Sequence, residues 1–323
     1  MDQTPRTPRA NTFAGLSLIL DRVAEHRDEA EWVQGHSDST DARYLLLDRA
    51  GETWLRTDEA GLRWLDQTER HRLLPDAPAT LLGLIGPRPH FLLTLDEQTP
   101  AESFDAALGG RRANLRNAGL LLPATEAGLF AYAKGLAHWQ NETRHCAYCG
   151  SALTLVAAGH RAQCGNPTCG RLHFPRTDAA IIVIVEHGDA CLLGRQAGWP
   201  KGRYSTLAGF VEPGESLEDA VRREVAEESG VIVDQAHYHS SQPWPLPASL
   251  MVGFTATAVS REIHLRDREL EEARWFTAQQ IVDGLADGSF APPFALSVSY
   301  QLLSHWLARR GLDLDALVAR VAR

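Results

Sequence analysis

The stretch that decides the fold runs from Gly209 to Val231 and reads GFVEPGESLEDAVRREVAEESGV. Its middle predicts a helix over 217–229. Ser216, three residues before Asp219, is a capping-box-like start, and Gly230 is a typical glycine at a helix C-terminus. The limits of this helix are therefore well marked in the sequence.

The predicted helix carries carboxylates on the same face as its apolar residues. With Leu217 at the centre of the core-facing stripe, Glu224 and Glu228 fall within about 20° of it and Glu227 lies on the flank. The negative end of the helix dipole opposes all three, so a cation is needed to compensate them. Oxygen ligands without thiolate or imidazole select Mg²⁺ or Mn²⁺. Arg223 could orient the cluster, because it lies one residue before Glu224 and four residues before Glu227.

Composition describes an ordinary globular chain of about two domains, with 323 residues, 44% of them hydrophobic and 23% charged. The net charge of -9 excludes a global positive field, so a polyanionic ligand would need a local site. The longest unbroken apolar run, 179–185, is far shorter than the about 20 residues of a membrane helix. We expect a soluble, cytoplasmic protein without a membrane partner, because the N-terminus is also a poor secretion signal.

Four of the five cysteines lie close together, with the spacing Cys146-x2-Cys149 and Cys164-x4-Cys169. Two such turns rich in small residues suit one tetrahedral Zn²⁺, and four thiolates leave no open position, so this zinc should be structural, one per chain. The alternative is four unrelated buried cysteines. Cys191, inside a strand-like run, is predicted to be a small core residue.

The glutamate helix resembles a known motif. Gly209, Glu215 after five residues, and REVAEESGV at 223–231 match every fixed position of the Nudix box. The chain thus resembles Nudix hydrolases, which cleave nucleoside diphosphates linked to another moiety using a divalent metal. The resemblance implies a loop-helix-loop set on an α/β/α sandwich with a mixed sheet. It implies Glu227 or Glu228 as general base, and metal-binding positions at Ala208, Glu224, Glu228 and Glu269.

A second motif, SQPWPLPAS at 241–249, resembles the signature of the NADH pyrophosphatase branch. Its prolines stiffen an extended segment and Trp244 offers a flat face for a ring, whereas the alternative is a proline-rich surface loop with a half-buried tryptophan. Leu246 stands where the branch usually has Phe. The predicted substrate-binding residues here are Gln242, Pro243, Trp244, Pro245, Leu246, Pro247, Ala248 and Ser249.

Three further positions follow from the resemblance. Phe174 is expected to stack on the adenine with Phe210 beside it, and ordinary core packing is the alternative for both. Ser299 aligns with a substrate-lining position. The branch also implies a homodimer in which the Trp244 segment reaches across the interface.

We expect a strand-rich N-terminal domain over 1–125, whose own function the sequence does not show. It is followed by a connecting helix over 126–142, a zinc ribbon over 143–175, a Nudix domain over 176–310 and a C-terminal tail over 311–323. The implied activity is hydrolysis of NADH or NAD to nicotinamide mononucleotide and AMP, with removal of NAD caps from RNA as an extension. The alternatives are a broader ADP-ribose or dinucleotide pyrophosphatase and a catalytically silent, nucleotide-sensing zinc-ribbon regulator.

Overall fold

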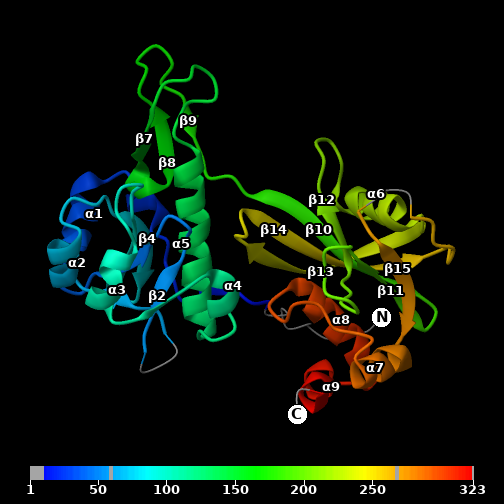
Figure 1. The fold of residues 1–323 in the computed structure, drawn as a ribbon. Helices are drawn as coiled ribbons and strands as arrows, with labels where there is room; N and C mark the ends of the chain where they lie inside the picture. The colour runs from blue at the N-terminus through cyan, green and yellow to red at the C-terminus, as the bar shows by residue number, and fades with distance from the viewer. Residues whose placement is uncertain (1–10, 58–60, 266–268, 322–323) are drawn as a thin grey trace. The chain divides into compact units, whose positions relative to one another are not determined.

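The computed structural model describes residues 11–57, 61–265 and 269–321, which form two compact units (Figure 1). The N-terminal unit consists of residues 13–177 and 244–248. The C-terminal unit consists of residues 178–243 and 249–321 together with Asn11 and Thr12. The main division after Thr177 falls two residues beyond the expected start of the last large domain.

The N-terminal unit is built on a sheet of order β4-β5-β1-β2-β6, with β3 paired to β1. The central β1 (Arg43–Leu47) is buried over its last four residues and pairs parallel with β5 and antiparallel with β2. β5 begins at Arg88, so the turn after β4 consists of Gly86 and Pro87. The other elements are β2 (Thr53–Leu55), β3 (Trp64–Leu65), β4 (Thr80–Ile85), β5 (Arg88–Thr94), β6 (Arg111–Ala113), η1 (Leu16–Leu18), η2 (Ala24–His26), α1 (Ala30–Ser37), α2 (Gln67–Leu73), α3 (Glu102–Leu108) and α4 (Leu115–Ala118).

The long helix α5 (Ala124–Glu142) belongs to the core of this unit rather than linking two domains. Leu129, Phe130 and Leu136 on it are buried, and Leu129 packs in one cluster with Leu16 of η1. The predicted ribbon follows as an antiparallel sheet of β7 (Leu153–Val156), β8 (Arg161–Cys164) and β9 (Leu172–His173), with η3 (Ala157–Gly159) between the first two strands.

The C-terminal unit is organised around β10 (Asp178–His187), which contains the longest apolar run of the sequence. Ile181, Val183 and Val185 pack in one core cluster with residues of α6, whereas Ile182 and Ile184 pack in another with residues of α8. The run is apolar throughout because both faces of the strand are covered. Figure 1 shows α6 and α8 on opposite faces of this sheet, which confirms the predicted α/β/α sandwich.

The sheet of this unit is mixed, as expected, with order β13-β14-β10-β11-β15 and β12 paired to β10. β14 runs parallel to β10, and β11 and β12 run antiparallel to it. Cys191 is fully buried on β11, which confirms its prediction as a core residue. The elements are β11 (Ala190–Arg195), β12 (Leu207–Phe210), α6 (Leu217–Ser229), β13 (Val233–Trp244), β14 (Ser249–Ala258), β15 (Glu272–Thr277), α7 (Ala278–Asp287), α8 (Val298–Ala308) and α9 (Leu314–Val321).

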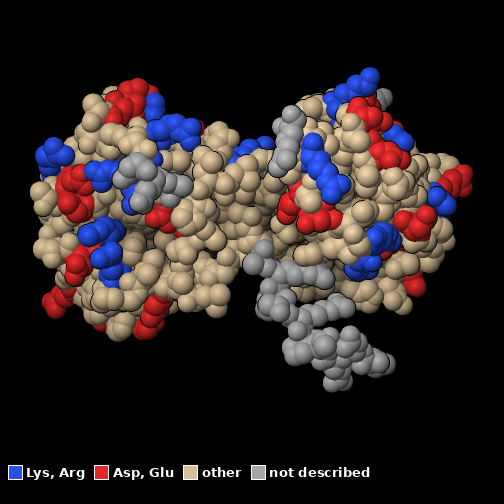
Figure 2. Space-filling view, turned by 90° about the horizontal axis from the view of Figure 1, so that it is seen from below, with Lys and Arg blue, Asp and Glu red and all other residues tan. Residues whose placement is uncertain are grey.

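The segment expected to be a C-terminal tail contains α9, whose Leu314 is fully buried in the same cluster as α8. Apolar residues at helical spacing hold it there, so it completes the core. No helix in the described ranges combines the length and apolarity needed to cross a membrane. On the face shown in Figure 2, cationic and acidic side chains are interspersed instead of gathered into one patch, in keeping with the composition.

Candidate active site and metal centres

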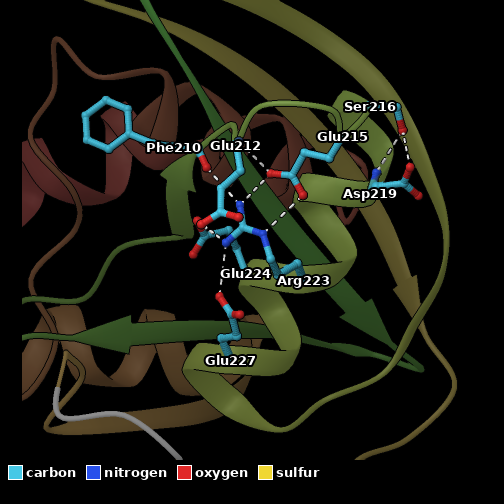
Figure 3. Close-up of polar contacts among 8 residues, drawn as sticks. All are labelled: Phe210, Glu212, Glu215, Ser216, Asp219, Arg223, Glu224 and Glu227. Atoms are coloured by element: carbon cyan, nitrogen blue, oxygen red, sulfur yellow. Dashed lines mark hydrogen bonds and ion pairs between the residues drawn. The ribbon is translucent and has the colours of Figure 1, made fainter.

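The helix that carries the glutamates has the predicted bounds and is held at both ends. The Ser216 hydroxyl accepts a hydrogen bond from the backbone N–H of Asp219 at 3.1 Å and donates one to its carboxylate at 2.8 Å (Figure 3). Gly230 ends the helix in the left-handed region with φ 73°. A Cβ there would also lie 3.0 Å from the Cβ of His264, so glycine serves both the turn and the packing.

The three predicted carboxylates lie at different depths. Glu228 is buried, with 3% of its surface exposed, Glu224 is partly buried, and the side chain of Glu227 is 54% exposed. The carboxyl group of Glu224 lies against Gly209 of β12, where a Cβ would come within 1.9 Å of its carboxyl carbon. The Glu224 carboxylate can therefore hold this position only because residue 209 has no side chain.

Arg223 connects the acidic side chains (Figure 3). Its Nε and Nη2 donate to the two carboxylate oxygens of Glu215 at 3.1 and 2.6 Å. Its Nη1 donates to Glu224 at 2.9 Å and to Glu227 at 3.0 Å, and Nη2 also donates to the carbonyl of Phe210 at 2.8 Å. The orienting contacts expected for Arg223 are thus present. Glu215 was not among the predicted site residues, although its place in the box was the signal.

The surroundings of the Glu224 carboxylate disfavour a further negative charge. Burial raises the pKa of Glu224, the hydrogen bond and charge of Arg223 oppose this rise, and the charges of Glu227 and Glu269 add to it. Arg223 lowers the pKa of Glu215 through its hydrogen bond. Glu269 is exposed and its charge acts on Glu224, and its metal-binding role stays a prediction. This all-oxygen set, with Glu228 buried beside it on the same helix, fits a hard divalent cation.

The remaining predicted metal position, Ala208, lies on β12 directly opposite Ile182 of β10 and next to Gly209. It is partly buried.

Gln242, a predicted substrate-binding residue, forms hydrogen bonds within the fold, and its contact with substrate stays a prediction. Its amide is fully buried on β13, where Nε2 donates to the carbonyls of Leu296 at 2.6 Å and Thr12 at 3.1 Å. Its Oε1 accepts from the backbone N–H of Val298 at 2.8 Å. These bonds use the side chain to hold the chain ahead of α8, because a buried amide must be satisfied within the fold.

Ser299, the predicted substrate-lining residue, is bonded within the fold in the same way, and its predicted role is likewise untested. It is 1% exposed, and its Oγ lies 2.8 Å from the hydroxyl of Ser205 and 2.8 Å from that of Thr206. The backbone N–H of Thr206 also donates to it, at 3.1 Å. The hydroxyl therefore ties α8 to the segment before β12.

The rest of the proline-rich motif is divided between the two units. Pro243 ends the part that belongs to the C-terminal unit, whereas Trp244 to Ala248 pack with the N-terminal unit, where Trp244 is half-buried and its ring centroid lies 6.5 Å from that of Phe13. Pro245 is buried, and Pro243 and Pro247 are exposed. Leu246 donates its backbone N–H to the carbonyl of Trp244 at 2.7 Å, and Ser249 begins β14.

The two phenylalanines predicted to stack on adenine are not core residues. Phe174 is 61% exposed and Phe210 is 60% exposed, so the core alternative is wrong for both. In Figure 3 the ring of Phe210 points away from the carboxylates while its carbonyl faces Arg223. Both rings are accessible to a ligand, and their stacking role stays a prediction.

The four clustered cysteines converge, with one Sγ of each within 4.8 Å of all the others. The Sγ atoms of Cys146 and Cys169 are 3.9 Å apart, and those of Cys149 and Cys164 are 3.4 Å apart. Sulfurs that bind one tetrahedral Zn²⁺ lie about 3.8 Å from one another. Hydrogen bonds from Ser151 lower the pKa of Cys149 to about 6. The set fits zinc, and the alternative of unrelated cysteines is excluded.

His173 adds a contact that sequence reasoning missed. Its Nε2 lies 3.3 Å from the Sγ of Cys146, so the ring can donate a hydrogen bond to a metal-bound thiolate.

Comparisons with known proteins agree with this architecture. A family model described as NUDIX domain matches residues 175–294, and one described as NADH pyrophosphatase-like rudimentary NUDIX domain matches residues 14–139. The NAD-capped RNA hydrolase NudC of Stutzerimonas stutzeri is 38% identical over 247 residues, which are 76% of this chain and 82% of that protein. The NAD-capped RNA hydrolase NUDT12 of Homo sapiens is 44% identical over 200 residues, which are 58% of this chain. This chain covers 43% of the length of that human relative.

With the glutamate helix in its sandwich and these matches together, the chain belongs to the Nudix family. The rudimentary NUDIX domain in its N-terminal unit and the match to NudC place it in the NADH pyrophosphatase branch. The strand-rich domain at the N-terminus is thus similar to a rudimentary NUDIX domain. Sequence reasoning could not detect this, because residues 14–139 carry no box of glutamates.

Proposed function

We propose that this chain hydrolyses the diphosphate bond of NADH and NAD, giving nicotinamide mononucleotide and AMP, and cleaves the same bond in NAD-capped RNA. The observation that carries the proposal is the carboxylate cluster. Glu228 is buried at the end of α6, and Glu224 is held between Arg223 and Gly209. The names of the NudC and NUDT12 relatives support NAD-capped RNA as a substrate class.

In the proposed reaction a water molecule adds to one phosphorus, the bond from that phosphorus to the bridging oxygen breaks, and the water proton passes to a carboxylate. A bound Mg²⁺ or Mn²⁺, held by Glu224 and Glu228 with Ala208 and Glu269, would neutralise charge on the diphosphate and make the water more nucleophilic. Glu227 is exposed to receive the proton, and Glu228 is the alternative base. Arg223 keeps Glu224 and Glu227 at fixed positions.

Substrate recognition is assigned to the exposed rings of Phe174 and Phe210 and to Trp244 with its neighbouring prolines. The proposal includes a homodimer that shares the Trp244 segment, a cytoplasmic location, and one structural Zn²⁺ on Cys146, Cys149, Cys164 and Cys169. The convergence of these four sulfurs supports the zinc.

The test is a product assay on NADH, NAD, ADP-ribose and NAD-capped RNA with Mg²⁺ or Mn²⁺, for the wild type and for Glu228→Gln. The variant keeps the shape of the side chain and removes the charge, so we expect kcat to fall by roughly 10³ or more with the fold intact. Glu218→Gln, on an exposed position of the same helix, is the matched control and should keep wild-type turnover.

Three results would redirect the proposal or remove a part of it. Preferential cleavage of ADP-ribose would favour the broader pyrophosphatase. Nucleotide binding without turnover on any of the four substrates would favour the silent regulator. More than half of wild-type turnover in Glu228→Gln at saturating metal would remove Glu228 from the metal site.

A further inference from the structure

The zinc ribbon differs in charge from the rest of the chain. Residues 143–177 contain four arginines and three histidines but no Asp or Glu, in a chain with 41 acidic residues. At the average density of the chain, about four acidic residues would fall in a segment of this length. Acidic side chains are therefore kept out of a segment that lies on the surface of an acidic protein.

Not all of these arginines are available to a ligand. Arg144 pairs with Glu97 at 3.0 Å, and Arg161 pairs with Asp28. Arg171, by contrast, lies with its guanidinium carbon 3.8 Å from the ring centroid of Tyr148. Its planar cation covers one face of an aromatic ring whose residue is 72% exposed.

The two residues come from the two cysteine loops of the ribbon, Tyr148 from the first and Arg171 from the position after the second. These loops lie at the end of β7–β9 opposite to η3, which contacts β4 of the main sheet (Figure 1). Leu172 beside Arg171 is 43% exposed, and it pairs across the ribbon with the exposed Gln163. The outer end of the ribbon thus presents an aromatic ring, one cation and uncharged neighbours.

This combination matches the chemistry of an unpaired nucleotide. A base can stack on the open face of a tyrosine already backed by a guanidinium, and the same guanidinium can contact the adjoining phosphate. Four thiolates on Zn²⁺ carry a net charge of -2, so the ribbon attracts through stacking and one local cation, not through a broad positive field. Acidic side chains at this place would repel the phosphates, which gives a physical reason for their exclusion.

We propose that the outer end of the zinc ribbon, formed by Tyr148 and Arg171, binds single-stranded RNA. The inference rests on the proposed function in that it supplies the contact for the RNA body of a capped substrate.

The test uses the full zinc-loaded chain and a fluorescent 12-nucleotide RNA with a 5′-hydroxyl, which has no diphosphate bond to cleave. Fluorescence anisotropy gives Kd over a range of salt concentrations. Tyr148→Ala should weaken binding by about 5- to 150-fold, and Tyr148→Phe should retain it, because stacking needs the ring and not the hydroxyl. Arg171→Gln should weaken binding and reduce the slope of log K against log salt by about 0.7, the value for one phosphate contact on a single strand.

Arg72→Gln is the matched control, since it removes an exposed arginine from α2 of the same unit and should leave Kd unchanged. Zinc content and NADH hydrolysis should match the wild type in all three ribbon variants. If the RNA affinity of Tyr148→Ala equals that of the wild type, or an RNA duplex of the same length binds as tightly, the inference is wrong. If Tyr148→Ala loses both NADH hydrolysis and RNA binding, the inference is also overturned, because Tyr148 would then support the fold. An RNA affinity that depends on Tyr148 in a protein without NADH hydrolysis would refute the proposed function alone.

Discussion

Gly209→Ala tests the packing of β12 against the catalytic helix most directly. A Cβ at this position would lie 1.9 Å from both the carboxyl carbon and Oε1 of Glu224. The carboxyl group would have to move by roughly 1.5 Å to reach an ordinary van der Waals contact. The backbone of Gly209 is not in the left-handed region, so alanine itself is tolerated there.

The displaced atoms are the end of a flexible side chain, so we expect the free energy of unfolding to change by about 1 kcal/mol or less. The same movement would separate Glu224 from Arg223, now 2.9 Å away, and shift a proposed metal-binding oxygen. A misplacement of about 1 Å can cost a factor of 10² in rate, so kcat on NADH should fall by about that factor or more.

The assay pairs steady-state hydrolysis of NADH over a range of Mn²⁺ concentrations with urea unfolding. Gly198→Ala is the matched control, because its Cβ would meet no atom within 4 Å, and it should behave as wild type. Full activity in Gly209→Ala would refute the idea that the position of the Glu224 carboxylate matters. A loss of stability of several kcal/mol would show that the defect lies in folding and not in the site.

Three further predictions address zinc, pH and substrate class. Metal analysis should find about one Zn²⁺ per chain. Because structural zinc contributes folding free energy, Cys149→Ser should lower Tm before it affects turnover. A wild type that holds no zinc and melts like the variant would contradict this prediction. Burial lowers the pKa of His160 from 6.5 to about 4, so below pH 6.5 the unfolded chain takes up a proton that the folded chain does not. This group should therefore lower the free energy of unfolding by roughly 1.4 kcal/mol per pH unit as pH drops towards 4. Measured by urea unfolding, His160→Gln should lack this part of the pH dependence. His71→Gln, at an exposed position, should keep it. Trp244→Ala should reduce kcat/KM for NADH by roughly ten- to a hundredfold, whereas kcat/KM for a small activated diphosphate without rings should fall much less. Equal losses on the two substrates would assign Trp244 to the fold. A fully active monomer in sedimentation would contradict the shared pocket.

Local patterns in the sequence were sufficient to predict the helix that carries the glutamates. Its bounds, its caps and the inward face of Glu228 follow from spacing along one helix, and these are properties that neighbours in the chain decide. The apolar, β-branched run at 179–185 favours a strand for a related reason, because such a run is typical of a strand that is covered on both faces. The cysteine spacing likewise indicated the convergence of four sulfurs.

The roles of single polar residues depended on contacts between distant segments. Gln242 lies in the proline-rich motif and Ser299 at an aligned substrate-lining position, and the sequence did not show that both are buried. Gln242 is bonded to the carbonyl of Leu296, 54 residues further along the chain, and Ser299 to Thr206, 93 residues before it. Phe174 and Phe210 look equally suited to a core, yet the fold leaves both exposed. A side chain's burial is decided by which surfaces the folded chain brings against it. The sequence therefore determined the helix, the central strand and the donor sets, and only the tertiary structure decided which of the remaining residues can reach a ligand.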